Sequence, residues 1–404
     1  MAEPERVIES VARASYARLI SFLAARSNDV ASAEDALSEA FVAALRTWPT
    51  QGVPSKPEAW LLQAARHRLI DRIRSKQTQA AHAAELRATL AEAEARTEDF
   101  TFPDERLKLL FVCAHPAIDA RVHTPLMLQV VLGLDANSIA EAFVTPPATI
   151  GQRLSRAKAK IRDTRIAFDI PAGTELAPRL SAVLEAIYAA YNRGWDDVDG
   201  VDAQRRGLAE ESIWLARLLS ELLPEQPEAL ALLALMQYCE ARRPARRTPE
   251  GEYVPIAAQD TNLWLADCID EAESLLRRAA TFQQHGRFQL EAAVQSAHVQ
   301  RARTGSTNWP VIALLYEGLV RCAPTIGALL GRAAAVGEAH GAAAGLELLK
   351  AIPLASVANH QPYWAVRAHL ERQLGLHADA HTHFERAIRL TEDPAVRRFL
   401  ARNA

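Results

Sequence analysis

The spacing of apolar side chains constrains this chain more than any other feature of its sequence. Across residues 5–47, apolar side chains recur every three or four positions, which is the period of one face of an α-helix. The first run holds Tyr16, Leu19, Ile20 and Leu23, and the second holds Ala36, Leu37, Ala40, Phe41, Ala44 and Leu45. Alternating β-branched runs, the signal for strands, are nearly absent from the sequence. The pattern predicts an all-α fold.

Prolines, glycines and changes in composition divide this helical pattern into parts. Three prolines and a glycine between Trp48 and Pro57 predict a loop, with Pro57 at the first position of the next helix. Alanine, glutamate and glutamine dominate residues 77–103, which predicts a solvated acidic linker over residues 79–103. We therefore expect four parts, over residues 1–78, 79–103, 104–168 and 171–404.

The net charge hides two basic patches. The chain has 46 Lys and Arg against 49 Asp and Glu, and its formal net charge of −3 argues, by itself, against nucleic-acid binding. Residues 66–76 nevertheless hold five basic side chains and one acidic one, and residues 145–165 hold six and one. Because an average conceals such patches, DNA remains a candidate partner.

Residues 133–162 have the pattern of a helix-turn-helix. Asp135 is expected to cap a short helix, and Thr145 to cap a second helix with Pro146 at its first position. The expected buried residues are Ile139, Ala140 and Phe143 in the first helix and Ile150, Leu154 and Ala157 in the second. The second helix sends polar and basic side chains outward, namely Thr149, Gln152, Arg153, Arg156, Lys158 and Lys160. This architecture places side chains in a DNA major groove, although an ordinary solvated helix pair is the alternative.

Three stretches resemble the extracytoplasmic-function (ECF) sigma factors of bacteria. Residues 33–41 are similar to the core helix of region 2, and residues 60–74 to the helix that melts and reads the −10 element. Residues 139–143 and 148–158 resemble the region 4 helix-turn-helix that reads the −35 element. The resemblance covers residues 1–168, and the long C-terminal part is similar to the extension of one ECF subgroup.

The resemblance implies roles for particular residues. It assigns binding of core RNA polymerase to Glu34, Asp35, Glu39 and Phe41. It assigns −10 contacts to Trp60, Arg66, His67, Arg68, Asp71, Arg72 and Arg74. It assigns −35 contacts to the outward residues of the second helix, Thr149, Gln152, Arg153, Arg156, Lys158 and Lys160. The expected function is that of an alternative sigma factor; a DNA-binding regulator or a repeat scaffold, neither binding core polymerase, are the rival interpretations.

The C-terminal extension partly fits the 34-residue tetratricopeptide (TPR) pattern. Within residues 361–394 the matching positions are Trp364, Ala368, Ala380, Phe384 and Ala387. Stacked repeats form curved surfaces that bind peptides or proteins, so a regulatory partner or an intramolecular contact is expected there. A compact helical domain without a partner is the alternative.

Several classes of function lack their sequence signals. We find no Gly-rich phosphate loop, nucleophile elbow or metal-ligand spacing, so no enzyme activity, cofactor or metal is expected. No segment has the length and hydropathy of a signal peptide core or a membrane span, and the four cysteines have no paired spacing. The expectation is a cytoplasmic protein with reduced thiols and no membrane partner.

Overall fold

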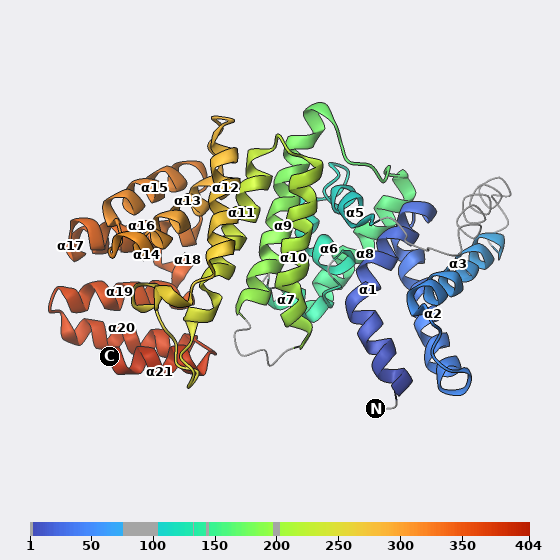
Figure 1. Cartoon of the computed structure of the whole chain (residues 1–404), viewed down its shortest axis with the longest axis horizontal. Helices are drawn as coiled ribbons and strands as arrows, with labels where there is room; N and C mark the ends of the chain where they lie inside the picture. Colours follow the sequence, from blue (N-terminus) through green and yellow to red (C-terminus); the bar gives the residue numbers. More distant parts are fainter. Residues whose placement is uncertain (1–2, 76–103, 132, 143–144, 197–202) are drawn as a thin grey trace. The chain divides into compact units, whose positions relative to one another are not determined.

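Helices dominate the structure throughout. The computed structural model describes residues 3–75, 104–131, 133–142, 145–196 and 203–404 (Figure 1). Most of these residues are helical and no β-strand occurs among them, although one isolated antiparallel bridge joins Arg247 and Tyr253. The predicted all-α fold is therefore confirmed. No helix in these ranges is long and apolar enough to cross a membrane, and the predicted linker over residues 79–103 lies outside them.

The chain divides into two compact units, Met1–Leu215 and Ala216–Ala404. Unit 1 contains α1 (Glu3–Ser27), α2 (Val30–Gln51), α3 (Pro57–Ser75), α5 (Arg106–Cys113), α6 (Ala120–Val130), α7 (Ala136–Ala142), α8 (Pro147–Thr164), the 3-10 helix η1 (Gly173–Glu175), α9 (Leu176–Asp196) and part of α10 (Ala203–Leu222). The boundary between the units falls inside α10.

Helices α1, α2 and α3 pack on one another and bury the apolar faces that the sequence predicts. Leu19, Leu37 and Leu61 are fully buried, and the rings of Trp48 and Trp60 meet edge to face at 5.5 Å. The expected loop after Trp48 starts later than predicted. Helix α2 continues through Pro49 to Gln51, and it ends at Gly52, where φ is +86° and the N–H donates to Trp48 O.

Helix α9 belongs with the helices before it. It packs against α5 and α6, and its Leu184, Ile187 and Tyr191 are buried. A Cβ at Gly194 would lie 2.5 Å from Ala209 N, so the absence of a side chain there permits close approach of α9 and α10. Unit 1 thus extends past residue 171, where the sequence predicted the extension to begin, because α9 covers apolar surface of α5 and α6.

Unit 2 consists of short helices that pack mostly on their sequence neighbours. It contains α11 (Pro227–Arg242), η2 (Arg243–Arg246), η3 (Ile256–Ala258), η4 (Thr261–Leu263), α12 (Ala266–Ala280), α13 (Arg287–Val299), α14 (Arg301–Thr304), α15 (Trp309–Cys322), α16 (Ile326–His340), α17 (Ala342–Lys350), α18 (Leu354–Val357), α19 (Gln361–Gln373), α20 (His377–Leu390) and α21 (Pro394–Asn403). Helices α19 and α20 pack closely, and the five positions of the TPR pattern are all buried in their apolar cluster.

Candidate polymerase-binding and nucleic-acid-binding surfaces

Helix α2 carries the four residues predicted to bind core polymerase. Its start is fixed by Asp29, whose carboxylate accepts hydrogen bonds from the N–H and the hydroxyl of Ser32. The apolar residues of α2 share one buried face, and Asp35 and Glu39 lie on the exposed side of the helix. Glu34 and Phe41 are half-buried.

Phe41 and Glu39 contact the neighbouring helices α1 and α3. The Phe41 ring stacks on Tyr16 of α1, with ring centroids 6.1 Å apart. Glu39 pairs with Arg68 of α3, with an oxygen-to-nitrogen distance of 3.5 Å. The predicted polymerase-binding surface on α2 therefore adjoins a residue predicted to contact the −10 element.

Two apolar side chains on α2 are exposed to solvent. Val42 and Leu45 on α2 are 47% and 48% exposed. Leu45 belongs to the periodic apolar run of the sequence, but it lies outside the buried face of α2, which includes Leu37, Ala40 and Ala44. Exposed apolar side chains beside acidic ones are typical of a protein-binding surface.

Helix α3 exposes some of the residues predicted to contact the −10 element and buries another. His67, Arg68 and Asp71 are exposed, and Trp60 is half-buried against Trp48. Arg66 is 6% exposed, and its guanidinium carbon lies 5.4 Å from the centroid of the Phe22 ring. The side chains of Arg72 and Arg74 lie outside the described part of the chain.

Helices α7 and α8 lie where the sequence predicts the two helices of the helix-turn-helix, with a different start for α8. Asp135 Oδ1 accepts the N–H of Asn137 at 2.8 Å, as expected of a cap, whereas Phe143 lies outside the described residues. Pro146, predicted to be the first helical residue, is instead the N-cap of α8, and Thr145 is not. The residue before a proline avoids helical backbone angles, so Pro146 stays extended and Pro147 begins the helix.

Helix α8 buries one face and exposes the other. Ile150, Leu154 and Ala157 are buried as predicted, together with Ile161. The exposed residues on the other side are Gln152, Arg153, Arg156 and Lys160, whereas Thr149 is half-buried.

The exposed face of α8 meets a further cation on α6. Arg121, Arg153, Arg156 and Lys160 line a cavity of about 280 Å³, which we call the basic notch. Asp119 also lines it and accepts the N–H of Arg121 at 2.9 Å as the N-cap of α6. No ion pair joins any of the four cations to another described residue. Their mutual repulsion makes the basic notch a place where an anion is stabilised.

The remaining predicted −35 residue, Lys158, points to α2 instead of solvent. Its Nζ lies 2.8 Å and 2.6 Å from the two carboxylate oxygens of Glu34, and both side chains are largely buried. Burial raises the pKa of the Glu34 carboxyl above its usual range, and the Lys158 ammonium partly offsets this shift. Lys158, which is predicted to bind DNA, thus forms an ion pair with Glu34, which is predicted to bind polymerase.

No metal centre accompanies these surfaces in the part of the chain that the structure describes. No group of three or more His, Cys, Asp and Glu side chains there is arranged to hold an ion.

Comparisons with known proteins match separate parts of the chain. Residues 11–79 match sigma-70 region 2, and residues 179–280 match a family of unknown function, DUF6596. The uncharacterized protein R00370 of Rhizobium meliloti (strain 1021) is 35% identical over 364 residues, covering 89% of this chain and 86% of that protein. No solved structure matches.

The match to region 2 covers α1 to α3, which carry the predicted polymerase and −10 residues. A sigma-70 region 2 supports a sigma-factor-like role in transcription initiation, with core RNA polymerase and promoter DNA as the implied partners. The chain belongs to the same family as the uncharacterized protein R00370 of Rhizobium meliloti, and its N-terminal helices form a sigma-70 region 2.

Proposed function

We propose that this protein is an alternative sigma factor of the ECF type. It binds core RNA polymerase, reads a −35 element with α8 and melts a −10 element with α3. The observation that supports this proposal is that one compact unit contains both a match to sigma-70 region 2 and the helix pair α7–α8, of which α8 has a basic exposed face. Its regulatory step is the choice of promoter, and it catalyses no reaction itself.

We assign two roles to the side chains of the proposed −35 surface: some contact bases and others contact phosphates. Gln152, Arg153 and Arg156 are exposed within the first three turns of α8, the part of a recognition helix that reaches base edges. The basic notch adds Arg121 from α6, and cations flanking a recognition helix contact phosphates. Arg121 is therefore proposed as a positioning contact without sequence preference.

Polymerase would bind the exposed side of α2. Asp35 and Glu39 supply negative charge, and Val42 and Leu45 supply apolar surface. The Lys158–Glu34 pair covers part of this side in the free protein. Binding of polymerase at Glu34 would thus release Lys158 for DNA, so each proposed surface is incomplete until the two helices separate.

The extension is proposed to modulate this activity through TPR-like helix pairs. The packing of α19 on α20, with all five pattern positions buried, supports a repeat of that kind. A modulating domain of this sort would act by binding a regulatory protein or another part of the same chain.

The decisive experiment is run-off transcription with purified core polymerase on fragmented genomic DNA. We expect transcripts from discrete start sites only when both this protein and core polymerase are present. Arg153→Ala should lower affinity for the −35 element by about 1–3 kcal/mol while leaving binding to random DNA nearly unchanged. Failure of core polymerase to retain the protein in a pull-down would reject the sigma factor in favour of a polymerase-independent DNA-binding protein.

A further inference from the structure

A loop near the start of unit 2 folds back on itself and reaches the last helix of the chain. It consists of residues 247–254, directly after η2, and we call it the hairpin loop. Thr248 donates its N–H to Glu252 O at 3.0 Å and accepts the N–H of Gly251 at 2.9 Å. The φ angle of Gly251 is +79°, which glycine adopts without strain. The hairpin loop is therefore a defined turn with its own hydrogen bonds.

Ion pairs join the hairpin loop to α21 at two places. Arg247 pairs with Asp393, the N-cap of α21. Glu252 accepts a hydrogen bond from Arg398 Nε at 2.8 Å and also pairs with Arg402. These partners lie 146 to 150 residues apart in the sequence, so the contact is a long-range one.

An aromatic contact accompanies these ion pairs. The rings of Tyr253 and Phe399 meet edge to face, with their centroids 5.3 Å apart. The guanidinium carbon of Arg247 lies 5.7 Å from the centroid of the Tyr253 ring, within the range of a cation–π interaction. Phe399 also packs against the apolar cluster that α19 and α20 share. The hairpin loop is thus connected through α21 to the core of the last helix pair.

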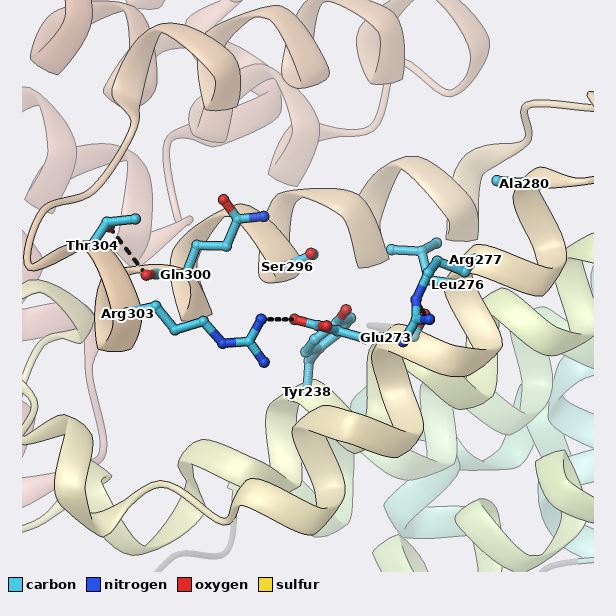
Figure 2. Close-up of a pocket in the computed structure, with 9 residues that line it drawn as sticks. All are labelled: Tyr238, Glu273, Leu276, Arg277, Ala280, Ser296, Gln300, Arg303 and Thr304. Carbon is cyan, nitrogen blue, oxygen red and sulfur yellow. Dashed lines mark hydrogen bonds and ion pairs between the residues drawn. The ribbon is translucent and has the colours of Figure 1, made fainter.

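At its other end the hairpin loop is anchored to the first helices of unit 2. Arg301 of α14 donates hydrogen bonds, at 2.8–3.0 Å, to three main-chain oxygens that follow the loop, those of Ile256, Ala257 and Gln259. Figure 2 shows Arg303, also of α14, beside Glu273 of α12, at a nitrogen-to-oxygen distance of 3.8 Å. Both side chains line a cavity of about 500 Å³ between the two helices. The hairpin loop therefore connects α21 to α14 and, through α14, to α12.

This contact joins the two ends of an array of helices. Most helices of unit 2 pack on their sequence neighbours, from α11 on α12 to α20 on α21. In an array of this kind a terminal helix has a neighbour on one side only, so it opens more readily than the others. The hairpin loop gives α21 a second neighbour, which comes from the opposite end of unit 2 (Figure 1).

We propose that the hairpin loop is an electrostatic clasp that closes unit 2 at low ionic strength and opens as the ionic strength rises. The side chains of Arg398 and Arg402 are 51% and 60% exposed, so salt screens their attraction to Glu252. The pair of Arg247 with Asp393 is less exposed and is screened less. In the open state α21 keeps its packing on α20 and loses its contact with the start of unit 2. This device is independent of whether unit 1 acts as a sigma factor.

Hydrogen-exchange mass spectrometry on the full chain tests the clasp. Glu252→Gln should raise the exchange rates of the hairpin loop and of α21 together, by about threefold at low salt, because exposed ion pairs contribute modestly to stability. Glu250→Gln changes an exposed glutamate on the same loop, and it should leave both rates unchanged. Exchange in α15 and α16, in the middle of unit 2, is the internal reference, and circular dichroism establishes that each variant is folded.

A salt series and a charge exchange distinguish the clasp from ordinary packing. Raising sodium chloride from about 50 mM to about 1 M should speed exchange in both segments of the parent chain, and the effect should be smaller in Glu252→Gln than in Glu250→Gln. Glu252→Arg alone should also speed exchange, whereas combining it with Arg398→Glu and Arg402→Glu should restore slow exchange. The clasp is overturned if the Glu252 variants leave exchange in α21 unchanged, or if salt affects neither segment.

Discussion

At the scale of single residues, Arg121 is the cation in the basic notch that no sequence pattern identified. Arg153, Arg156 and Lys160 follow one another on the amphipathic helix α8, so helical periodicity predicts that they share a face. Arg121 comes from α6, and only the packing of α6 against α8 brings it to them. Long-range contacts of this kind cannot be read from local spacing.

Replacing Arg121 should weaken DNA binding uniformly. Arg121→Ala removes one proposed phosphate contact, so the slope of log affinity against log salt should become shallower by about 0.9, for promoter and random duplexes alike. Fluorescence anisotropy across a salt series measures the slope. Arg6→Ala, an exposed arginine on α1, serves as the control. An unchanged slope would remove Arg121 from the proposed interface.

Also at this scale, His298 of α13 makes the stability of unit 2 depend on pH. Burial, together with the charges of Arg242 and Arg301, lowers the pKa of His298 to about 4. The unfolded chain therefore takes up a proton as pH falls below about 6.5, before the folded chain can do so. The contribution of neutral His298 is complete above pH 6.5 and is lost progressively as pH falls toward 4.

Replacing His298 should reduce this dependence on pH. His298→Gln is expected to flatten the fall in unfolding free energy between pH 6.5 and pH 4, a fall of up to about 3 kcal/mol from this group. Urea unfolding followed at several pH values measures it. His340→Gln, at an exposed position on α16, should leave the profile unchanged. Identical profiles for the His298 variant and the parent chain would contradict the assignment.

At the scale of helices, the ion pair between α2 and α8 can be tested by cross-linking the free protein. A zero-length carbodiimide reagent should join Lys158 to Glu34, because the ammonium touches the carboxylate. Mass spectrometry of the digested protein identifies the linked peptides. Binding of core polymerase should abolish this link if, as proposed, polymerase occupies Glu34.

A second pair provides the internal control for that measurement. Lys350 and Glu347 lie 2.8 Å apart on the single helix α17, so their link should form with or without polymerase. Persistence of the Lys158–Glu34 link in a polymerase complex would show that α8 stays docked on α2. The proposed release of Lys158 would then be wrong.

Sequence reasoning succeeded best on helices with strong periodicity. It predicted which face of α8 is buried, because Ile150, Leu154 and Ala157 keep helical spacing. It predicted the start of α3 at Pro57 correctly and the start of α8 one residue early, because two consecutive prolines there compete for the first position. Helical spacing predicted that Lys158 points outward from α8, but it could not show that Glu34 of α2 covers that part of the helix.

At the scale of the whole molecule, the position of α9 determines where the chain can be cut. A chain ending at Leu222 keeps all of unit 1, whereas one ending at Ile170 lacks α9 and uncovers apolar surface on α5 and α6. We expect the shorter chain to unfold at a lower temperature, by circular dichroism, and to expose hydrophobic surface to a fluorescent dye. Equal unfolding temperatures for the two chains would show that α9 adds nothing to unit 1.

The same arrangement has a consequence for biosynthesis. A ribosome delivers α5 to α8 before it delivers α9, so α5 and α6 leave the exit tunnel before the helix that covers them. During that interval apolar surface is open to solvent and to other nascent chains. Rare codons placed between residues 165 and 196 would lengthen the interval, and chaperone capture should increase with it.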